Sequence, residues 1–209
     1  MHVYFIEGNI GTGKSTFLSM VEKLFPGDNQ VIYEPVDMWT SLSDDSGTNI
    51  LEYFYNNQKR YAYTFQSLAF ISRMEKLGEI DTTKNNVFIE RSIWSDSNVF
   101  ARNCFLSGTL SDIEYKLYKR WFQWAETTVK IEDMKHVYLR CEPGKSLERT
   151  KIRDRKEERG IPIDYMEQIH LRHEEWISTI PSDKRITIDV NDVNIKDEKV
   201  FREMFLKTF

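Results

Sequence analysis

The chain contains 209 residues, with 33 acidic and 29 basic side chains, a formal charge of −4 and a pI near 5.7. We expect a single domain over residues 1–209, because a chain of this length can bury a full core without disulfides. The 40% apolar and 30% charged residues argue against collagen-like, disordered and coiled-coil proteins. The acidic balance disfavours a protein that binds nucleic acid, and no apolar run approaches the roughly 20 residues of a membrane span.

The cysteines and the first residues of the chain indicate the cellular compartment of the protein. Cys104 and Cys141 are the only cysteines, too few for a disulfide framework and typical of a reducing compartment. A strand-like segment stands almost directly after Met1, which indicates no signal or transit peptide. The sequence therefore predicts a cytoplasmic protein with no membrane partner.

Short segments rich in β-branched and aromatic residues alternate along the chain with longer segments of helical spacing. The predicted strands are His2–Ile6, Val31–Tyr33, Val87–Ile89, His136–Leu139 and Arg185–Val190. The predicted helices are Ser15–Phe25, Gln58–Leu77, Ser95–Leu106, Asp112–Lys130, Pro143–Arg155, Pro162–Thr179 and Lys196–Lys207. This order predicts a three-layer α/β fold, in which helices flank a five-stranded parallel sheet. Ligands of such folds bind at the carboxyl ends of the strands.

The first predicted strand is followed by a glycine-rich sequence, GNIGTGKS at Gly8–Ser15, which satisfies the pattern G-x-x-x-x-G-K-[ST]. In such a loop, backbone N–H groups and the N-terminus of the next helix face phosphate oxygens. Lys14 would reach the β- and γ-phosphates, and Ser15 would bind Mg²⁺. We therefore predict a site for ATP and Mg²⁺. Its loop residues are Gly8, Asn9, Ile10, Gly11, Thr12, Gly13, Lys14, Ser15 and Thr16.

Charged residues also follow the second and third predicted strands. Glu34 is placed to take a proton from an attacking hydroxyl. Glu90 suits Mg²⁺ and Arg91 suits an acceptor oxygen, although a structural ion pair explains these two residues equally well. A GTPase is not indicated, because the guanine-reading sequence N-K-x-D is absent.

A run of basic residues follows the fourth predicted strand and ends at Gly160. The ordinary interpretation is a solvated helix face. In a protein with a phosphate-binding loop, the same run can form a mobile lid over the triphosphate, at about residues 149–160. Aromatic residues make up 13% of the chain, which indicates an aromatic core, a site for a flat ligand, or both.

Taken together, these motifs resemble the deoxynucleoside kinase family. The similar segments are EGNIGTGKST (Glu7–Thr16), YEPVDMW (Tyr33–Trp39), YTFQ (Tyr63–Gln66), IERSIWSD (Ile89–Asp96) and RTKIRDRKEERGIPIDYMEQIHLRHEEW (Arg149–Trp176). The resemblance implies a P-loop fold like that of nucleoside monophosphate kinases. It also implies a homodimer that transfers the γ-phosphoryl group of a nucleoside triphosphate, with Mg²⁺, to the 5′-hydroxyl of a deoxynucleoside.

The same resemblance implies roles for individual residues. Glu34 is similar to the family's base, and Arg91 to the arginine that contacts the 5′-oxygen. Tyr55 and Glu158 match positions that hold the 3′-hydroxyl. The residues implied around the nucleobase are Gln66, which reads its edge, and the aromatic Trp39, Phe65 and Phe100. The residues implied in the lid are Arg149, Arg153 and Arg155.

Arg73 and Asp96 bear on which base is preferred. Family members that prefer deoxycytidine or purine deoxynucleosides resemble this chain in carrying an Arg/Asp pair, whereas thymidine-preferring members have apolar or small residues there. Asp96 can accept a hydrogen bond from an exocyclic amine, and a thymine methyl would meet a charged wall. We therefore expect deoxycytidine, deoxyadenosine or deoxyguanosine to be preferred over thymidine.

Two other functions stay open. A thymidylate-type nucleoside monophosphate kinase shares the fold, but its members place Arg before the Glu-Pro pair, where this chain has Tyr33. An unshielded Glu34 would then repel an acceptor phosphate. A non-catalytic nucleotide-binding module would usually lack Lys14, Glu34 or the lid arginines, which are all present. The apolar faces of Gln58–Leu77 and Asp112–Lys130 are the expected interface of the homodimer.

Overall fold

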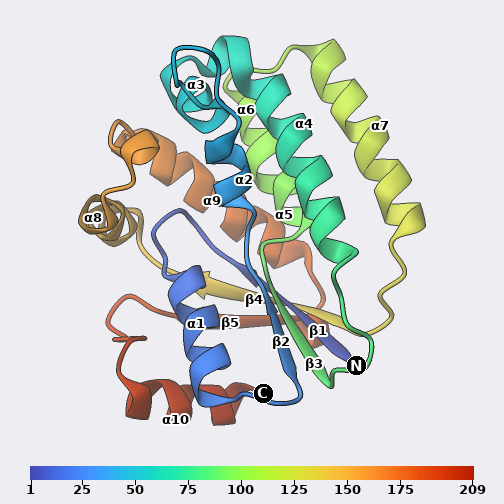
Figure 1. Ribbon diagram of the computed structural model, residues 1–209, viewed down its shortest axis with the longest axis vertical. Helices are drawn as coiled ribbons and strands as arrows, with labels where there is room; N and C mark the ends of the chain where they lie inside the picture. The colour runs from blue at the N-terminus through green and yellow to red at the C-terminus, as the bar shows by residue number, and fades with distance from the viewer.

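The structure, a computed structural model, describes residues 1–209 and contains a five-stranded sheet in the order β2-β3-β1-β4-β5 (Figure 1). All neighbouring strands are parallel. The strands are β1 His2–Glu7, β2 Asn29–Ile32, β3 Asn86–Glu90, β4 Met134–Arg140 and β5 Arg185–Asp189. The predicted α/β fold with a five-stranded parallel sheet is confirmed, with strand ends shifted by one or two residues.

The residue pattern of β1 explains why the sheet lies between two layers. Val3 and Phe5 are buried in a cluster on one face of the sheet, and Tyr4 and Ile6 are buried in a cluster on the other. Successive residues of a strand point to opposite faces. A strand that is apolar at each of these positions must therefore be covered on both sides.

Helices form the two outer layers. They are α1 Lys14–Leu24, α2 Val36–Ser41, α3 Ile50–Asn56, α4 Gln58–Leu77, α5 Ile93–Ser95, α6 Arg102–Leu106, α7 Asp112–Thr128, α8 Pro143–Arg153, α9 Ile163–Thr179 and α10 Glu198–Thr208. No helix combines the length and the apolar character that a membrane crossing requires.

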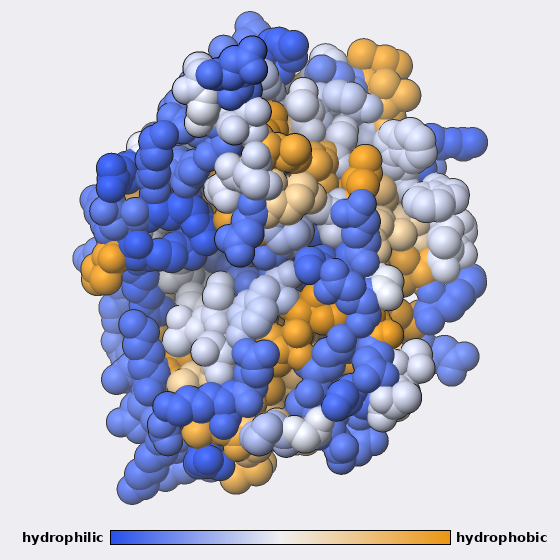
Figure 2. All heavy atoms as spheres, in the orientation of Figure 1, coloured by the Kyte–Doolittle hydropathy of each residue, from blue (hydrophilic) through white to orange (hydrophobic).

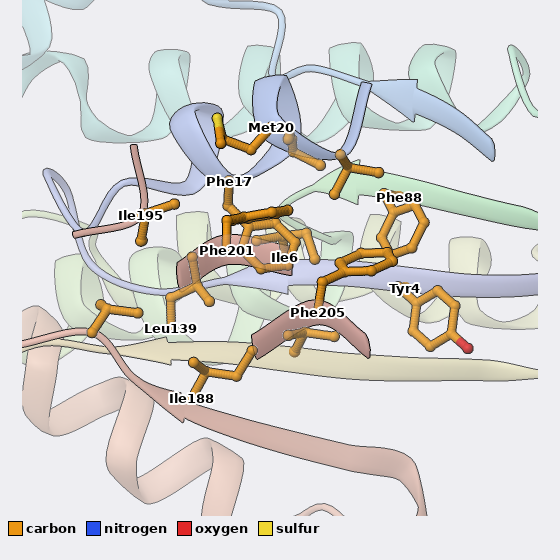
Figure 3. Close-up of a cluster of buried hydrophobic side chains, with 14 of the residues drawn as sticks. Tyr4, Ile6, Phe17, Met20, Phe88, Leu139, Ile188, Ile195, Phe201 and Phe205 are labelled. Carbon is orange, nitrogen blue, oxygen red and sulfur yellow. The ribbon is translucent and has the colours of Figure 1, made fainter. Parts of the chain in front are cut away.

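The layer made by α1 and α10 has an aromatic core. Phe17 of α1 and Phe201 of α10 contact each other, with ring centroids 5.1 Å apart. Figure 3 shows these rings beside Ile6 of β1. The opposite layer contains α4, α7 and α9 (Figure 1). Much of the aromatic content of the chain therefore belongs to the core.

Two short helices after β2, α2 and α3, were not predicted. They contain six and seven residues, too few for a clear apolar period. The side chain of Asn49 caps α3 by accepting a hydrogen bond from the backbone N–H of Glu52 at 2.9 Å. These two helices bring Trp39 and Tyr55 to the edge of the sheet where the glycine-rich loop lies.

The helix predicted at Ser95–Leu106 is divided. α5 and α6 flank a π-helical segment, Asp96–Ala101. Such segments are rare and often occur at functional sites, because the wider turn changes which side chains share a face. This one contains Asp96 and Phe100, which are both predicted site residues.

Candidate active site

The glycine-rich loop connects β1 to α1 at the carboxyl edge of the sheet. Gly11 and Gly13 have φ values of +77° and +96°, which residues with a side chain rarely adopt. A Cβ atom at Gly11 would also lie 2.2 Å from the carbonyl oxygen of Ser146 and 2.4 Å from Thr150 Oγ1, both on α8. Gly11 is therefore required for the loop to pack against α8.

Lys14, the first residue of α1, folds back over the loop. Its Nζ donates hydrogen bonds to the carbonyl oxygens of Asn9 at 2.7 Å and Gly8 at 3.3 Å. Burial and the nearby positive charge of Arg91 lower the pKa of Lys14 to about 7. A bound triphosphate would raise this pKa, because nearby negative charge favours the protonated amine.

One cavity runs along the loop and the first turn of α1. It is lined by Gly11–Thr16, by Glu90, by Arg149, Ile152 and Arg153, and by Val193–Lys196. The backbone donors and positive charges of this cavity are those that a triphosphate requires. The segment Val193–Lys196 was not predicted, although it follows β5 and so lies at the edge where parallel sheets bind ligands.

Ser15 and Glu90, the predicted Mg²⁺ ligands, lie together in this cavity. Ser15 Oγ donates a hydrogen bond to Glu90 Oε1 at 2.9 Å. Burial and the negative charge of Glu34 raise the pKa of Glu90. The chain has no group of three or more His, Cys, Asp or Glu side chains that would hold a metal. This donor set fits Mg²⁺, which often takes one or two protein oxygens and completes its shell with phosphate and water.

A second cavity lies beside the first, between the edge of the sheet and α2, α3 and α4. All ten predicted substrate-binding residues line it, namely Glu34, Trp39, Tyr55, Phe65, Gln66, Arg73, Arg91, Asp96, Phe100 and Glu158. Its other walls include Val36, Leu51, Ala69 and Tyr165, which the sequence did not single out. The residues common to both cavities are Gly11, Lys14, Ser15, Glu90 and Arg153. The two cavities therefore meet at the glycine-rich loop.

Three loop residues predicted at the triphosphate do not line the first cavity. Gly8 and Asn9 line neither cavity, and Ile10 lines the second. Asn9 Nδ2 donates to the carbonyl oxygen of Met166 at 2.8 Å, which ties the loop to α9. In this structure, Gly8 and Asn9 shape the loop rather than form a cavity wall.

Glu34 lies in the second cavity between two arginines. Its Oε1 accepts a hydrogen bond from Arg73 Nη2 and lies 3.2 Å from Arg91 Nε. Burial alone would raise the pKa of Glu34, but the charges of Arg91 and Arg73 outweigh this effect and hold the pKa below its usual value. The electrostatic argument against an anionic acceptor was therefore wrong, because Glu34 is not unshielded. Tyr33 supplies no charge here, since its hydroxyl donates to Glu22 Oε2 at 2.9 Å.

Arg91 is fixed on several sides. Its φ of +63° is uncommon for a residue with a side chain. Nη1 donates to the carbonyl oxygen of Gly8 at 2.7 Å. The guanidinium carbon lies 4.6 Å from the centroid of the Phe100 ring, within the range of a cation–π contact. These contacts hold the guanidinium of Arg91 between Glu34 and the glycine-rich loop.

Arg73, Asp96 and Gln66 form a buried polar wall of the second cavity. Arg73 Nη1 donates to Asp96 Oδ1 at 2.6 Å. Asp96 Oδ2 and Gln66 Oε1 have no hydrogen-bond partner within the chain. Burial, with a smaller contribution from the charge of Glu34, raises the pKa of Asp96 to about 6. Because unpaired buried acceptors are unfavourable, this wall is suited to a ligand that brings hydrogen-bond donors.

The predicted lid corresponds to the end of α8 and a turn of 3-10 helix that contains Glu158. Glu158 is buried and accepts hydrogen bonds from Arg153 and, at 2.6 Å, from Arg155 Nη1. Arg149 and Arg153 line the first cavity, whereas Arg155 lines only the second. Burial and the charge of Glu158 raise the pKa of Tyr55, so its hydroxyl stays protonated.

Comparison with known proteins identifies the family. The sequence profile of the family described as "Deoxynucleoside kinase" matches residues 4–208. The chain belongs to the deoxynucleoside kinase family. This kinase is 36% identical to deoxycytidine kinase 2 of Gallus gallus, over 96% of this chain and 86% of the relative. It is 34% identical to the deoxycytidine kinase of Homo sapiens, over 82% of this chain and 74% of the relative.

The resemblance stated from the motifs is confirmed, and the kinase is an enzyme of a phosphotransferase family that uses a nucleoside triphosphate as donor. It is also 32% identical to mitochondrial thymidine kinase 2 of Homo sapiens, over 82% of this chain and 63% of the relative. Because the relatives include deoxycytidine and thymidine kinases, family membership alone leaves the preferred base open.

Proposed function

We propose that this kinase transfers the γ-phosphoryl group of ATP, or of another nucleoside triphosphate, to the 5′-hydroxyl of deoxycytidine or a purine deoxynucleoside in preference to thymidine. The observation that carries the base preference is the buried Arg73–Asp96 pair, in which Asp96 Oδ2 is an acceptor without a partner. The deoxycytidine kinases among the relatives support the same preference.

The chemistry of the bases explains how this wall would discriminate. An exocyclic amine, as in cytosine or adenine, offers a donor to Asp96, and Arg73 donates to a ring nitrogen or carbonyl oxygen. Thymine instead presents a carbonyl oxygen and a methyl group, so an acceptor would face an acceptor in a buried site. The Gln66 amide offers one donor and one acceptor to either kind of base. Gln66 therefore contributes more to the affinity for the nucleoside than to discrimination between bases.

In the proposed reaction, the 5′-oxygen attacks the γ-phosphorus, the bond to the bridging oxygen breaks, and the nucleoside diphosphate leaves. Glu34 accepts the proton of the 5′-hydroxyl, and Arg91 orients the 5′-oxygen. Two arginines keep Glu34 ionised and make it a weak base, so positioning contributes more than proton abstraction. Lys14 stabilises negative charge on the phosphates. Mg²⁺ at Ser15 and Glu90 would supply further charge neutralisation on the phosphate oxygens.

The rest of the second cavity would hold the nucleoside. Trp39, Phe65 and Phe100 would line or stack on the base, and Tyr55 and Glu158 would hold the 3′-hydroxyl. A lid at about residues 149–160, within a single domain of residues 1–209, would close over the phosphates. Arg153 supports this assignment because it lines both cavities.

An assay of ATP consumption with deoxycytidine, deoxyadenosine, deoxyguanosine and thymidine tests the proposal, with Glu34→Ala as the control. We expect turnover by the wild type and little by the variant. If no deoxynucleoside stimulated ATP consumption, the kinase proposal would be refuted and a non-catalytic nucleotide-binding module favoured. A higher kcat/KM for thymidine than for deoxycytidine would refute the base preference. Thymidine monophosphate as acceptor tests the nucleoside monophosphate kinase alternative.

We also propose a homodimer that forms through α7 with a contribution from α4. Ile113, Leu117, Trp121 and Trp124 are 47–64% exposed and recur every three or four residues of α7, so they form one stripe. Ile71 of α4 is 55% exposed. Figure 2 shows orange and near-white side chains along the edge that α7 occupies in Figure 1. An exposed apolar stripe of this kind supports the proposal, because such surfaces are common at protein interfaces. A sedimentation mass near the 24.9 kDa of one chain would contradict the dimer.

A further inference from the structure

Glu7 is a buried carboxylate outside both cavities. It is the last residue of β1, it stands directly before Gly8 of the glycine-rich loop, and its exposed fraction is 0%. Its Oε1 accepts a hydrogen bond from Ser92 Oγ at 2.6 Å and lies 3.2 Å from His136 Nδ1. Its Oε2 has no partner within the chain.

Glu7 is ionised despite its burial. Burial raises the pKa of a carboxylate, but the hydrogen bonds and charge from His136 and the hydrogen bond from Ser92 outweigh it, and the pKa of Glu7 falls to about 2. Because an ionised carboxylate only accepts hydrogen bonds, His136 Nδ1 must carry the proton of their contact. A buried charge with one unpaired oxygen is a poor device for stability. This arrangement therefore suggests a functional reason for Glu7.

Ser92, the partner of Glu7, directly follows Arg91. The Ser92 hydroxyl also accepts a hydrogen bond from the backbone N–H of Ser95 at 3.1 Å and so caps α5. The backbone N–H of Arg91 donates to the carbonyl oxygen of Ile6 at 3.0 Å, while its Nη1 donates to that of Gly8 at 2.7 Å. Three consecutive residues of β1 and the loop, positions 6 to 8, thus hold Arg91 and Ser92. This clamp maintains the uncommon φ of +63° at Arg91.

His136 supports the carboxylate from the neighbouring strand. It lies on β4 opposite Phe5 in the register of the sheet. Its ring packs against Phe5, Trp94 and Trp176, with ring centroids 5.6, 5.8 and 5.0 Å away. These three rings leave the imidazole little freedom, so Nδ1 stays directed at Glu7.

We propose that Glu7, supported by His136 and acting through Ser92, is a positioning residue for phosphoryl transfer. It touches neither substrate, but it holds the backbone turn that directs the guanidinium of Arg91 at the 5′-oxygen. The inference rests on the role proposed above for Arg91. A misplacement of about 1 Å at a reacting centre can reduce a rate about 100-fold, so loss of this clamp reduces kcat without weakening nucleoside binding.

The first test is Glu7→Gln, which keeps the shape but replaces the charge-assisted hydrogen bond from Ser92 with a weaker neutral one. We expect kcat to fall about 10- to 100-fold, with the KM of the nucleoside within about twofold of wild type. Ser111→Ala is the matched control, because Ser111 caps α7 as Ser92 caps α5 but lines neither cavity. Wild-type kcat in folded Glu7→Gln would overturn the proposal. A loss of kcat in Ser111→Ala equal to that in Glu7→Gln would overturn it as well.

The second test shows whether Glu7 acts through Arg91. In an Arg91→Ala background, Glu7→Gln should reduce kcat less than twofold further, because the group that it positions is gone. Losses that multiply would overturn the inference but leave the proposed function intact. If Arg91→Ala itself kept wild-type kcat, the proposed role of Arg91 would fail instead.

The third test separates hydrogen bonding by His136 from its packing. His136→Asn keeps an N–H donor close to the position of Nδ1, whereas His136→Leu removes the donor and fills the space between the aromatic rings better. We expect higher kcat in His136→Asn than in His136→Leu even where Leu gives the higher Tm. Equal kcat in the two variants, or a kcat that follows Tm, would indicate a packing role only and overturn the contribution of His136.

Discussion

The double substitution Arg73→Met with Asp96→Ala should shift this kinase toward thymidine. Arg73 donates to Asp96 at 2.6 Å, and both side chains are nearly fully buried. Replacing only Arg73 would leave the buried Asp96 carboxylate unpaired, which typically destabilises a protein by about 3–5 kcal/mol. Removing both charges avoids this penalty. It also replaces a charged wall with one that accepts the thymine methyl group.

The size of the shift follows from the contacts that are lost. A hydrogen bond from an exocyclic amine to a buried carboxylate contributes about 1.5–3 kcal/mol, so kcat/KM for deoxycytidine should fall about 10- to 150-fold. Thymidine makes no such bond, and its turnover should rise as the opposing acceptor disappears. Glu34 loses its bond from Arg73 but keeps Arg91 at 3.2 Å, so part of the catalytic arrangement remains.

Steady-state kinetics with both nucleosides measure the effect directly. The ratio of kcat/KM for thymidine to that for deoxycytidine should rise at least about 10-fold in the double variant. The Arg73→Met single variant is the control, and it should have a lower Tm than the double variant. An unchanged ratio in a well-folded double variant would refute the claim that Arg73 and Asp96 determine the base preference.

The remaining predictions concern the glycine-rich loop and the carboxylates of Glu34 and Asp96. Glu34→Gln should lower kcat about 10²-fold, the low end for loss of a general base, because Glu34 is a weak base, and a kcat near wild type would exclude Glu34 as the base. Gly11→Ala should abolish ATP binding in a calorimetric titration, because its Cβ would lie 2.2 Å from the Ser146 carbonyl oxygen. Gly47→Ala has a similar φ of +79° but an open environment, and it should bind ATP normally. As pH falls through about 6, Asp96 gains a proton and kcat/KM for deoxycytidine should fall, with no such inflection in Asp96→Asn. Because the pKa of Asp96 is raised in the folded state, protonation of Asp96 stabilises the fold as pH falls. If Tm fell with pH in the wild type but not in Asp96→Asn, unfolding rather than lost base recognition would explain the lower kcat/KM.

Local sequence patterns predict much of the fold. The spacing of apolar residues predicts α4 with the bounds that the structure has, Gln58–Leu77. Local patterns do not predict the order of the strands in the sheet. The pairing of β1 with β3 and β4 depends on contacts between segments far apart in the chain. The rule that ligands bind at the carboxyl ends of parallel strands is what brought Glu34, Glu90 and Arg91 into the candidate site.

The residues that sequence reasoning missed share a physical cause. Val36, Leu51, Ala69 and Tyr165 line the second cavity, but an apolar residue beside a cavity has the same local pattern as one inside the core. Glu7 gave no signal either, since a charged residue at the end of a strand is ordinary in sequence. Its significance lies in contacts with Ser92 and His136, which are 85 and 129 residues away along the chain.

Because Asp96, the proposed base-reading residue, lies in the π-helical segment Asp96–Ala101, the length of this one turn would influence the substrate range. A π turn closes its hydrogen bond one residue later than an α turn, and successive residues of a helix are rotated by about 100°. Deleting one residue from the segment would restore a regular helix. Asp96 would then be rotated about the helix axis by about a quarter of a turn relative to α6. The buried polar wall of Arg73, Asp96 and Gln66 would then have a different geometry, although its amino acids would be unchanged. Under the proposed function, insertions and deletions in this turn would therefore change the substrate range, as point substitutions would.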